Sequence, residues 1–246
     1  PTSVTEQWNG TNWTEVGDLN NGRPSPGAST NAPYTSAVVF GGGSYEANTE
    51  LWNGTAWTET TNLNTGVAEA GGTGGGSDSA LSISGRTPSF TTATEEWTGA
   101  GAAVGAWATG GTMNTGKRQT AGGGSQSAGI SFAGENNTAN QIANTELYNG
   151  STWTEVNDLN TARYLLGGAG AENTSAIAVG GEIQPGGNSA LTEQWNGTNW
   201  TENGDLNTAR RQLAVNAANS SNALAFGGGT PPYTAVTESF NGTNWT

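Results

Sequence analysis

One acidic residue recurs at the same place in a repeated motif and is the first candidate for chemistry. A Thr-Glu pair opens the motif six times, and the carboxylates of these pairs belong to Glu6, Glu50, Glu95, Glu146, Glu193 and Glu238. Paired carboxylates can serve as general acid and base, or they can bind a cation. A residue that every repeat carries is more typical of a structural role. We therefore expect each glutamate to form an ion pair or hydrogen bond with an arginine of an adjacent strand.

The other signals for catalysis or metal binding are weaker. Three acidic pairs could offer carboxylate oxygens to calcium: Glu15 with Asp18, Glu155 with Asp158, and Glu202 with Asp205. They lack the dense spacing of a calcium loop, so we expect a solvated surface. The glycine run Gly71–Ser79 has no Gly-Lys-Ser/Thr after it, as a phosphate loop would. The absence of both Cys and His excludes thiolate catalysis, a Ser-His pair and the usual zinc ligands. The sequence thus predicts no enzyme, no cofactor and no metal.

Charge and hydropathy narrow the class of partner. The 246 residues contain 7 Lys plus Arg against 20 Asp plus Glu, a net charge of -13. Such a surface repels a phosphate backbone and an anionic membrane, so we expect no nucleic acid partner. No apolar run is long enough to span a bilayer, and we expect no membrane insertion.

The motif belongs to a long internal repeat. The string TEQWNGTNWTE occupies residues 5–15 and returns unchanged at residues 192–202. Copies open at Thr5, Thr49, Thr94, Thr145, Thr192 and Thr237, which are 44 to 51 residues apart. A period near 45 is typical of a four-stranded propeller blade, and abundant Gly, Asn and Thr favour strands and turns over helices. We predict an all-β protein, a β-propeller of four-stranded blades. Residues 1–246 then form a single propeller domain, whole or an excerpt of a longer array.

Each repeat carries a hairpin with two aromatic residues. The pairs are Trp8/Trp13, Trp52/Trp57, Tyr148/Trp153, Trp195/Trp200 and Phe240/Trp245. Asn-Gly between them favours a two-residue type I′ turn, in which Trp8 faces Thr11. A four-residue loop is the alternative and places the two rings opposite each other. In both arrangements the rings face a neighbouring blade. The residues of the hairpin therefore repeat because each blade packs against the next in the same way.

The order of these signals resembles the kelch-repeat β-propeller. Kelch blades carry an apolar strand ending in Gly-Gly, then an aromatic residue, a Trp and an Arg. Here Gly-Gly follows Phe40, Val179 and Phe226, and the arginines are Arg23, Arg163 and Arg210. The second unit departs, with Val67 in the Arg position, and the third has Lys117 there. The repeat sequence is also similar to kelch-like arrays in predicted proteins of marine phages and uncultured marine microbes.

The number of blades follows from the inner strands. Five candidates stand near Gly27–Thr30, Ala68–Thr73, Gln119–Gly123, Leu165–Ala169 and Leu213–Ala217, yet the chain has six hairpins. The candidates consist mostly of small residues, which suit the crowded axis of a ring with few blades. We expect five blades, the alternative being six with one inner pair lacking. In a five-bladed ring the hairpin Val4–Glu15 would close the blade begun by Leu213–Gly228. The C-terminal hairpin would then be displaced or pass to another subunit.

The loops between the second and third strands vary most and predict a binding face. They are Gly41–Asn48, Gly85–Ala93, Gly134–Asn144, Gly181–Leu191 and Gly227–Val236. In a propeller they share a face with the connections between blades. The candidate ligand-binding residues there are the rings of Tyr45, Phe90, Tyr164 and Tyr233, which could stack on sugars, and the donors Arg163 and Arg210. The alternative is that these rings only cover the blade ends.

These features favour a non-catalytic binding or display module over two other functions. The module would be extracellular or on a virion surface and would contact a glycan or a host-surface receptor through one face. A purely structural propeller, joined to other copies or assembly proteins through a terminal hairpin, is the first alternative. An enzyme with a site in the axial pocket is the second. The N-x-Ser/Thr sequons fall in the hairpins, where Asn-Gly-Thr is expected for the turn alone.

Overall fold

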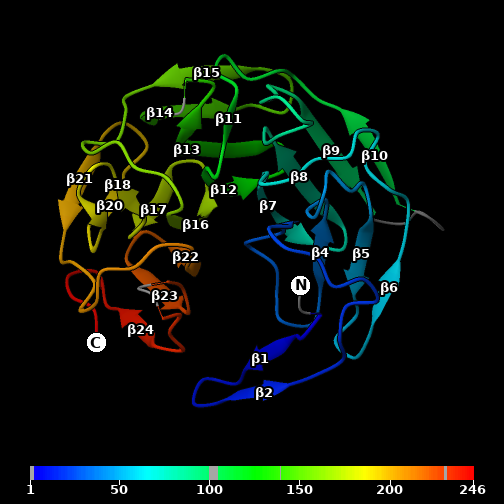
Figure 1. The fold of residues 1–246 in the computed structure, drawn as a ribbon, viewed down its shortest axis with the longest axis horizontal. Helices are drawn as coiled ribbons and strands as arrows, with labels where there is room; N and C mark the ends of the chain where they lie inside the picture. The colour runs from blue at the N-terminus through cyan, green and yellow to red at the C-terminus, as the bar shows by residue number, and fades with distance from the viewer. Residues whose placement is uncertain (1–2, 100–104, 139, 230–231) are drawn as a thin grey trace.

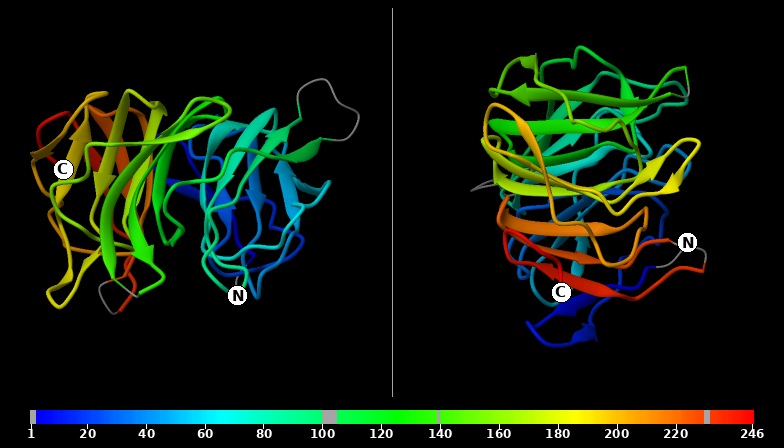
Figure 2. Two further views of the ribbon diagram at one scale, coloured as in Figure 1. Left: turned by 90° about the horizontal axis from the view of Figure 1, so that it is seen from above. Right: turned by 90° about the vertical axis from the view of Figure 1, so that its left-hand side faces the viewer.

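The chain folds into five antiparallel β-sheets arranged around one axis as the blades of a five-bladed propeller (Figure 1). The computed structural model describes residues 3–99, 105–138, 140–229 and 232–246. These residues contain no helix, and so none that is long and apolar enough to cross a membrane. The predicted fold class and blade number are confirmed. In the edge-on views of Figure 2 the sheets stand side by side, with their connecting loops at the two faces of the disc.

The first three blades follow one another along the chain. The first contains β3 (Gly27–Ala28), β4 (Ala37–Phe40), β5 (Thr49–Trp52) and β6 (Trp57–Glu59). The second contains β7 (Gly71–Gly76), β8 (Ser79–Ile83), β9 (Thr94–Thr98) and β10 (Ala106–Thr109). The third contains β11 (Lys117–Arg118), β12 (Ala121–Ser125), β13 (Ala128–Asn136), β14 (Gln141–Tyr148) and β15 (Trp153–Val156).

The last two blades keep the same order from the axis outward. The fourth contains β16 (Gly167–Glu172), β17 (Ser175–Val179), β20 (Thr192–Trp195) and β21 (Trp200–Asn203). A small hairpin, β18 (Glu182–Ile183) with β19 (Gly187–Asn188), extends its loop between the second and third strands. The fifth contains β22 (Ala214–Asn219), β23 (Asn222–Phe226) and β24 (Thr237–Phe240), and Trp245 bridges Phe240 at its outer edge.

Small residues let the inner strands approach one another. Strand β12 contacts β7 on one side and β16 on the other, and β16 in turn contacts β22. A Cβ added to Gly123 of β12 would lie 3.0 Å from the backbone nitrogen of Gly170 in β16. Any larger side chain there would force the blades apart, which is the predicted reason for the Gly- and Ala-rich inner strands.

The repeated hairpin closes with a four-residue loop. In the registers Trp8↔Trp13, Trp52↔Trp57 and Trp195↔Trp200 the two rings stand directly opposite each other. The side-chain oxygen of Asn9 accepts hydrogen bonds from the backbone N–H of Thr11 and Asn12, 2.9 Å each. The two-residue turn is therefore wrong and its alternative is confirmed. The asparagine side chain satisfies two loop amides, and the rings pair at 4.9–5.5 Å in all six hairpins.

Neighbouring units are joined by one repeated hydrogen bond. The indole N–H of each outermost Trp donates to the hydroxyl of the Thr that opens the preceding hairpin, at 2.9–3.2 Å. The six bonds run from Trp13 to Thr237, Trp57 to Thr5, Trp107 to Thr49, Trp153 to Thr94, Trp200 to Thr145 and Trp245 to Thr192. They form a closed circle, because Trp13 near one terminus reaches Thr237 near the other.

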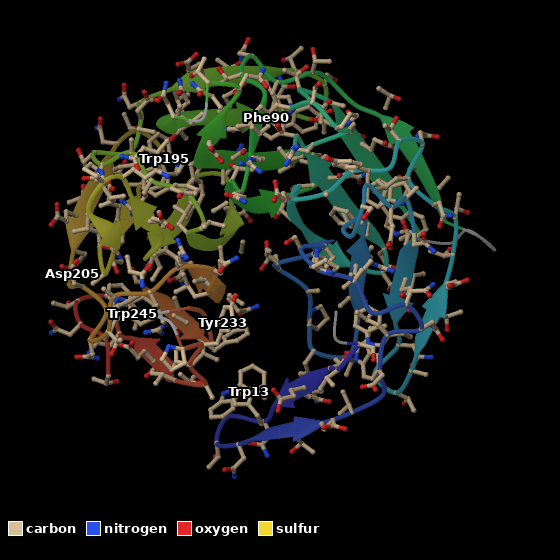
Figure 3. All side chains as sticks on the ribbon, in the orientation of Figure 1. Trp13, Phe90, Trp195, Asp205, Tyr233 and Trp245 are labelled. Atoms are coloured by element: carbon tan, nitrogen blue, oxygen red, sulfur yellow. The ribbon has the colours of Figure 1, made fainter. Side chains whose placement is uncertain are left out.

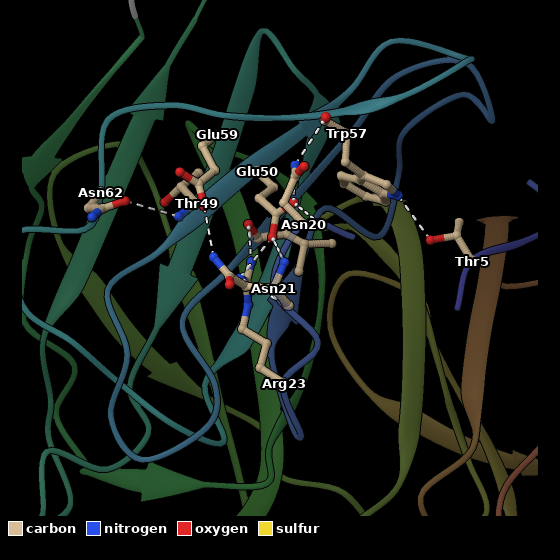
Figure 4. A network of polar contacts seen from close by, with 10 residues as sticks. Thr5, Asn20, Asn21, Arg23, Thr49, Glu50, Trp57, Glu59 and Asn62 are labelled. Carbon is tan, nitrogen blue, oxygen red and sulfur yellow. Dashed lines mark hydrogen bonds and ion pairs between the residues drawn. The ribbon is translucent and has the colours of Figure 1, made fainter. Parts of the chain in front are cut away.

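The repeated glutamate anchors the connection that leads into its own blade. Glu50 accepts bonds from the backbone and side chain of Asn20, at 2.8 and 2.9 Å, and pairs with Arg23 at 3.0 Å (Figure 4). Glu193 pairs in the same way with Arg163, and Glu238 with Arg210. These pairs are buried, and the predicted ion pair between the repeated Glu and Arg is confirmed.

Two units depart from this pattern where the sequence departs. Val67 replaces the arginine in the second blade, so Glu95 is held by the amides of Asn64 and Thr65. In the third blade Lys117 is fully buried, and its ammonium donates to the carbonyls of Ser131 and Asn144. Burial lowers the pKa of Lys117 to about 8, although the nearby Glu146 opposes the shift.

The N-terminal hairpin corrects our expectation of how the ring closes. Strands β1 (Glu6–Trp8) and β2 (Trp13–Glu15) form a two-stranded sheet of their own between the fifth and first blades (Figure 1). They do not complete the fifth blade, because the outer edge of β23 is already paired with β24. The C-terminal hairpin is not displaced either, and it remains the outer part of its own blade.

Loss of one hairpin tryptophan is expected to destabilise the fold strongly. Trp153 is 6% exposed, so Trp153→Ala should lower the free energy of unfolding by roughly 3–5 kcal/mol in urea denaturation. Trp153→Phe keeps an aromatic ring and loses the bond to Thr94, so it should cost only about 1–2 kcal/mol. Equal urea midpoints for Trp153→Ala and the parent would contradict this packing.

The only lysine of the chain gives a pH-dependent prediction. Between pH 8 and the ordinary lysine pKa of 10.5 the unfolded chain holds a proton at Lys117 that the folded chain has released. The free energy of unfolding should therefore rise with pH there, by up to about 1.4 kcal/mol per pH unit. Lys117→Arg should add about 1 kcal/mol at pH 7 by pairing with Glu146, and it should abolish the rise. Denaturation between pH 7 and 9.5 measures both effects, and a flat parent profile would refute the assignment.

Candidate functional site

Five residues, one from each blade, encircle the mouth of the axis. They are Ser25, Glu69, Gln119, Leu165 and Gln212, each two residues after the Arg position of the repeat. The backbone N–H of each one after Ser25 donates to the carbonyl of the one before it, at 2.7–3.3 Å. We call this set the mouth ring. Its backbone groups bond to one another, and all five residues line the cavity at the mouth.

Every member of the mouth ring has a left-handed backbone. The φ angles are 51°, 59°, 50°, 54° and 54°, a region that costs a non-glycine residue roughly 1–2 kcal/mol. The chain contains 40 glycines, and at a second repeated left-handed position, after the second strand, three units use Gly41, Gly180 and Gly227 while two use Ser84 and Ala133. At the mouth none of the five units uses glycine. The side chains are therefore kept there against a conformational cost.

The mouth ring opens into two adjoining cavities. One, of about 410 Å³, lies over the axis and is lined by all five ring residues. The other, of about 280 Å³, lies beside it between Ser25, Tyr45, Glu69 and Arg86. Because Ser25 and Glu69 line both, the two form one continuous depression of the size of a small ligand site.

The charges at the mouth compensate one another. Arg118 bonds Glu69 at 2.9 Å and Glu135 at 2.7 Å, and Gln119 donates to Glu69 at 3.2 Å. Burial lowers the pKa of Arg118, but its bonds to Glu69 and Glu135 outweigh that effect and raise the pKa overall. The side-chain oxygen of Gln119 is buried and has no hydrogen-bond partner among the described residues. It lies beneath the surface of the depression, and the amide nitrogen of the same side chain is held by Glu69.

Two of the predicted aromatic residues stand beside arginines near this depression. Tyr45 is 37% exposed, has a φ of 68° and lies with its ring 6.0 Å from the guanidinium of Arg86. Phe90 lies under the guanidinium of Arg118 at 5.2 Å, so that one face of its ring is covered. Tyr45 therefore presents a ring to the cavity, whereas Phe90 supports Arg118 from behind.

The other two predicted rings differ in exposure. Tyr233 is 81% exposed and lines a cavity of about 120 Å³ with Arg211 and Gln212 (Figure 3). Tyr164 is 9% exposed, and its hydroxyl accepts a bond of 2.7 Å from Gln184. Tyr233 is open to a ligand, while Tyr164 covers the end of its blade.

The two predicted arginine donors are out of reach. Arg163 and Arg210 are fully buried and are held by Glu193 and Glu238 and by carbonyls of strands β17 and β23. Their prediction as binding residues is wrong, because the same arginines form the ion pair that anchors each connection.

The loops after the second strand lie beside the connections between blades on one face, as the sequence predicts. Loops after the second strand bridge the connections between blades at Ala68↔Arg86, Tyr164↔Glu182 and Arg211↔Gly229. Ala139, Thr230 and Pro231 of two of these loops lie outside the described residues. Sequence reasoning missed Glu69, Gln119 and Gln212. Their fixed distance from the Arg position is the signal that could have found them.

The side chains at the mouth are suited to hydrogen bonding and stacking. In the described ranges no three acidic side chains, with or without other metal ligands, gather at one point. The mouth offers amides, a hydroxyl, a paired carboxylate and the rings of Tyr45 and Tyr233. Such groups recognise an uncharged, hydroxyl-rich molecule through hydrogen bonds and stacking.

Comparison with known proteins adds information on the fold. No protein-family model matches the chain, and no curated protein matches it. Among solved structures it is similar to YjhT, with 14% sequence identity, a TM-score of 0.75, and coverage of 99% of this chain and 90% of that one. At this identity the similarity supports the propeller architecture and carries no activity over to this chain.

Glycine at the mouth should raise stability. Gln212→Gly relieves a left-handed residue, so we expect the free energy of unfolding to rise by about 0.5–1 kcal/mol. The matched control is Gln7→Gly in β1, where an ordinary strand conformation should make glycine cost about 0.5–1 kcal/mol. Urea denaturation of both variants tests the opposite signs. A loss of stability in Gln212→Gly equal to that of the control would contradict the strain at the mouth.

Proposed function

We propose that this protein is a non-catalytic binding module that holds a glycan at the axial mouth. The observation that carries the proposal is the mouth ring: five left-handed positions in five blades, all with side chains where glycine would cost less. Strain that is repeated in every unit and faces a cavity is more economically explained by a ligand than by folding.

The chemistry of the depression supports a sugar rather than an ion. The two carboxylates of Glu69 and Glu135 are balanced by the guanidinium groups of Arg118 and Arg86, so the depression offers no net charge to an ionic ligand. The hydroxyl of Ser25 and the exposed side-chain amide of Gln212 suit ligand hydroxyl groups. Tyr45 and Tyr233 supply rings for the flat faces of two sugar units, one on each side of the ring.

The same contacts argue against catalysis. Glu69 and Glu135 both pair with Arg118, so their carboxylate oxygens are engaged in ion pairs rather than free to contact a reacting group. We extend the proposal to an extracellular or virion-surface location, in keeping with the kelch-like repeats and the acidic surface. Contact with a host-surface receptor would occur through the glycans that the receptor carries.

A glycan array followed by titration of the best-bound glycan tests this function. Tyr45→Ala and Tyr233→Ala should each raise Kd roughly fivefold, the equivalent of about 1 kcal/mol per stacked ring. Their effects should multiply in the double variant, since the rings contact different parts of the ligand.

The matched control is Tyr34→Ala. Tyr34 is 69% exposed and lies in the loop between β3 and β4, away from the mouth, so this change should leave Kd unaltered. Binding that survives in the Tyr45/Tyr233 double variant, or that falls equally in Tyr34→Ala, would refute a site at the mouth.

A further inference from the structure

The hairpin β1–β2 stands at a sixth position of the ring. Trp13 bonds Thr237 and packs against Phe226 at 4.8 Å, as Trp200 packs against Phe132 at 4.8 Å between the third and fourth blades. Figure 3 shows Trp13 projecting from the hairpin toward the fifth blade. On the other side, Trp57 of the first blade bonds Thr5. The hairpin therefore makes the contacts of an outer half-blade on both sides.

No inner strand pair accompanies this hairpin within the described residues. β1 pairs with β2 alone, whereas the strands at the equivalent place in the blades all pair with an inner strand: β5 with β4, β9 with β8, β14 with β13, β20 with β17 and β24 with β23. In β1 the bond from Val16 N–H to Thr5 C=O sets the alternation, so the backbone groups of Glu6 and Trp8 point to the open edge. An open strand edge is a template for a further strand.

The neighbouring fifth blade is exposed toward the same position. Ala214 is exposed, although Gly27, Gly71, Ala121 and Gly167, which open the other inner strands, are all buried. Phe226 is only partly buried, unlike Phe40 and Phe132, which are 0% exposed. A groove of about 390 Å³, lined by Trp8, Trp13, Tyr34, Leu224 and Phe226 among others, lies between the hairpin and the two flanking blades.

Glu6 in the groove carries a negative charge without the partners that the equivalent glutamates have. The five equivalent glutamates are buried and are bonded by the Asn of a connector that reads L-N-x-x in four blades and M-N-x-x in the third, and three of them pair with its Arg. Glu6 is exposed and has no hydrogen bond or ion pair in the described part of the chain. A segment that filled the position would satisfy Glu6 by bringing the same connector.

We propose that this groove docks a peptide segment with the sequence pattern of the inner half of a repeat unit. The segment would read L-N-x-x-R, then a Gly/Ala-rich strand, then an apolar strand ending in Gly-Gly. Its second strand would pair with the open edge of β1, its apolar side chains would cover Phe226 and Trp8, and its Arg would pair with Glu6. A second copy of this chain is a poor donor, because its five inner halves are already placed in their own blades.

A peptide with the sequence of residues 159–181 is the probe, since it carries the connector and both inner strands of the fourth blade. Fluorescence anisotropy of the labelled peptide with the full chain should show saturable one-to-one binding. A scrambled peptide of the same composition should not bind. Amide hydrogen exchange at Glu6 and Trp8 should slow when the peptide is present.

The charge contact is tested by a pair of matched variants. Glu6→Gln should weaken binding about tenfold, the value of one charge-assisted bond, while Glu15→Gln on the opposing strand should leave it unchanged. A peptide with Gln in place of its Arg should bind the parent about tenfold more weakly than the unchanged peptide does. The two peptides should bind the Glu6→Gln variant with equal affinity. Because Glu6 is exposed and unpaired, its replacement leaves the folded chain intact.

Several results would overturn the proposal. Absence of saturable binding would do so, as would equal affinity of Glu6→Gln and the parent. A concentration-dependent dimer in sedimentation that Glu6→Gln abolishes and the peptide fails to displace would assign the groove to a second copy instead. None of these results bears on the glycan site, which lies at the mouth of the axis.

Discussion

The structure depends on one hydrogen bond that is made six times, from an indole N–H to the threonine hydroxyl of the preceding unit. Each bond ties the outermost strand of one hairpin to the third strand of its neighbour, so the hairpins must repeat the same letters to stay in register. The aromatic pair beside it removes water from the bond and adds the apolar area that a small-residue inner strand cannot supply. The circle is complete because Trp13 reaches Thr237, so the ends of the chain are held together without sharing a sheet.

In the part of the chain that the structure describes, the ring contains six hairpins and only five pairs of inner strands, so one hairpin has no inner pair beside it. The outer circle sets six positions, and the inner strands fill five of them. Three departures from the repeat accompany this mismatch among the described residues: Glu6 contacts no connector, Ala214 is exposed, and Phe226 is only partly covered. Each is ordinary in sequence and unusual only in its surroundings. The groove therefore results from the difference between the number of hairpins and the number of inner strand pairs, and not from any one residue.

Features that recur in every repeat could be predicted from the sequence. Features that depend on the burial and the neighbours of a single residue could not. The β-propeller, the five blades and the Glu–Arg pair were predictable, because they rest on letters that recur at fixed spacing. The hairpin turn was misjudged because Asn9 can serve both a tight turn and a wider loop capped by its own side chain. Arg163 and Arg210 were assigned to binding although the same pattern placed them in ion pairs, and a buried pair leaves no donor for a ligand. The mouth ring was missed because its members share a backbone conformation and no residue type.

That last property explains how a uniform scaffold can carry a variable site. The mouth ring is held by backbone N–H and carbonyl groups, which every residue at those positions possesses, so Ser, Glu, Gln and Leu are all compatible with it. The contacts between blades use specific side chains, and a change there would open the circle. Substitution at the mouth alters only the surface offered to a ligand, at a conformational cost that each unit bears separately. Recognition can therefore diverge at the mouth while the letters that close the ring stay fixed.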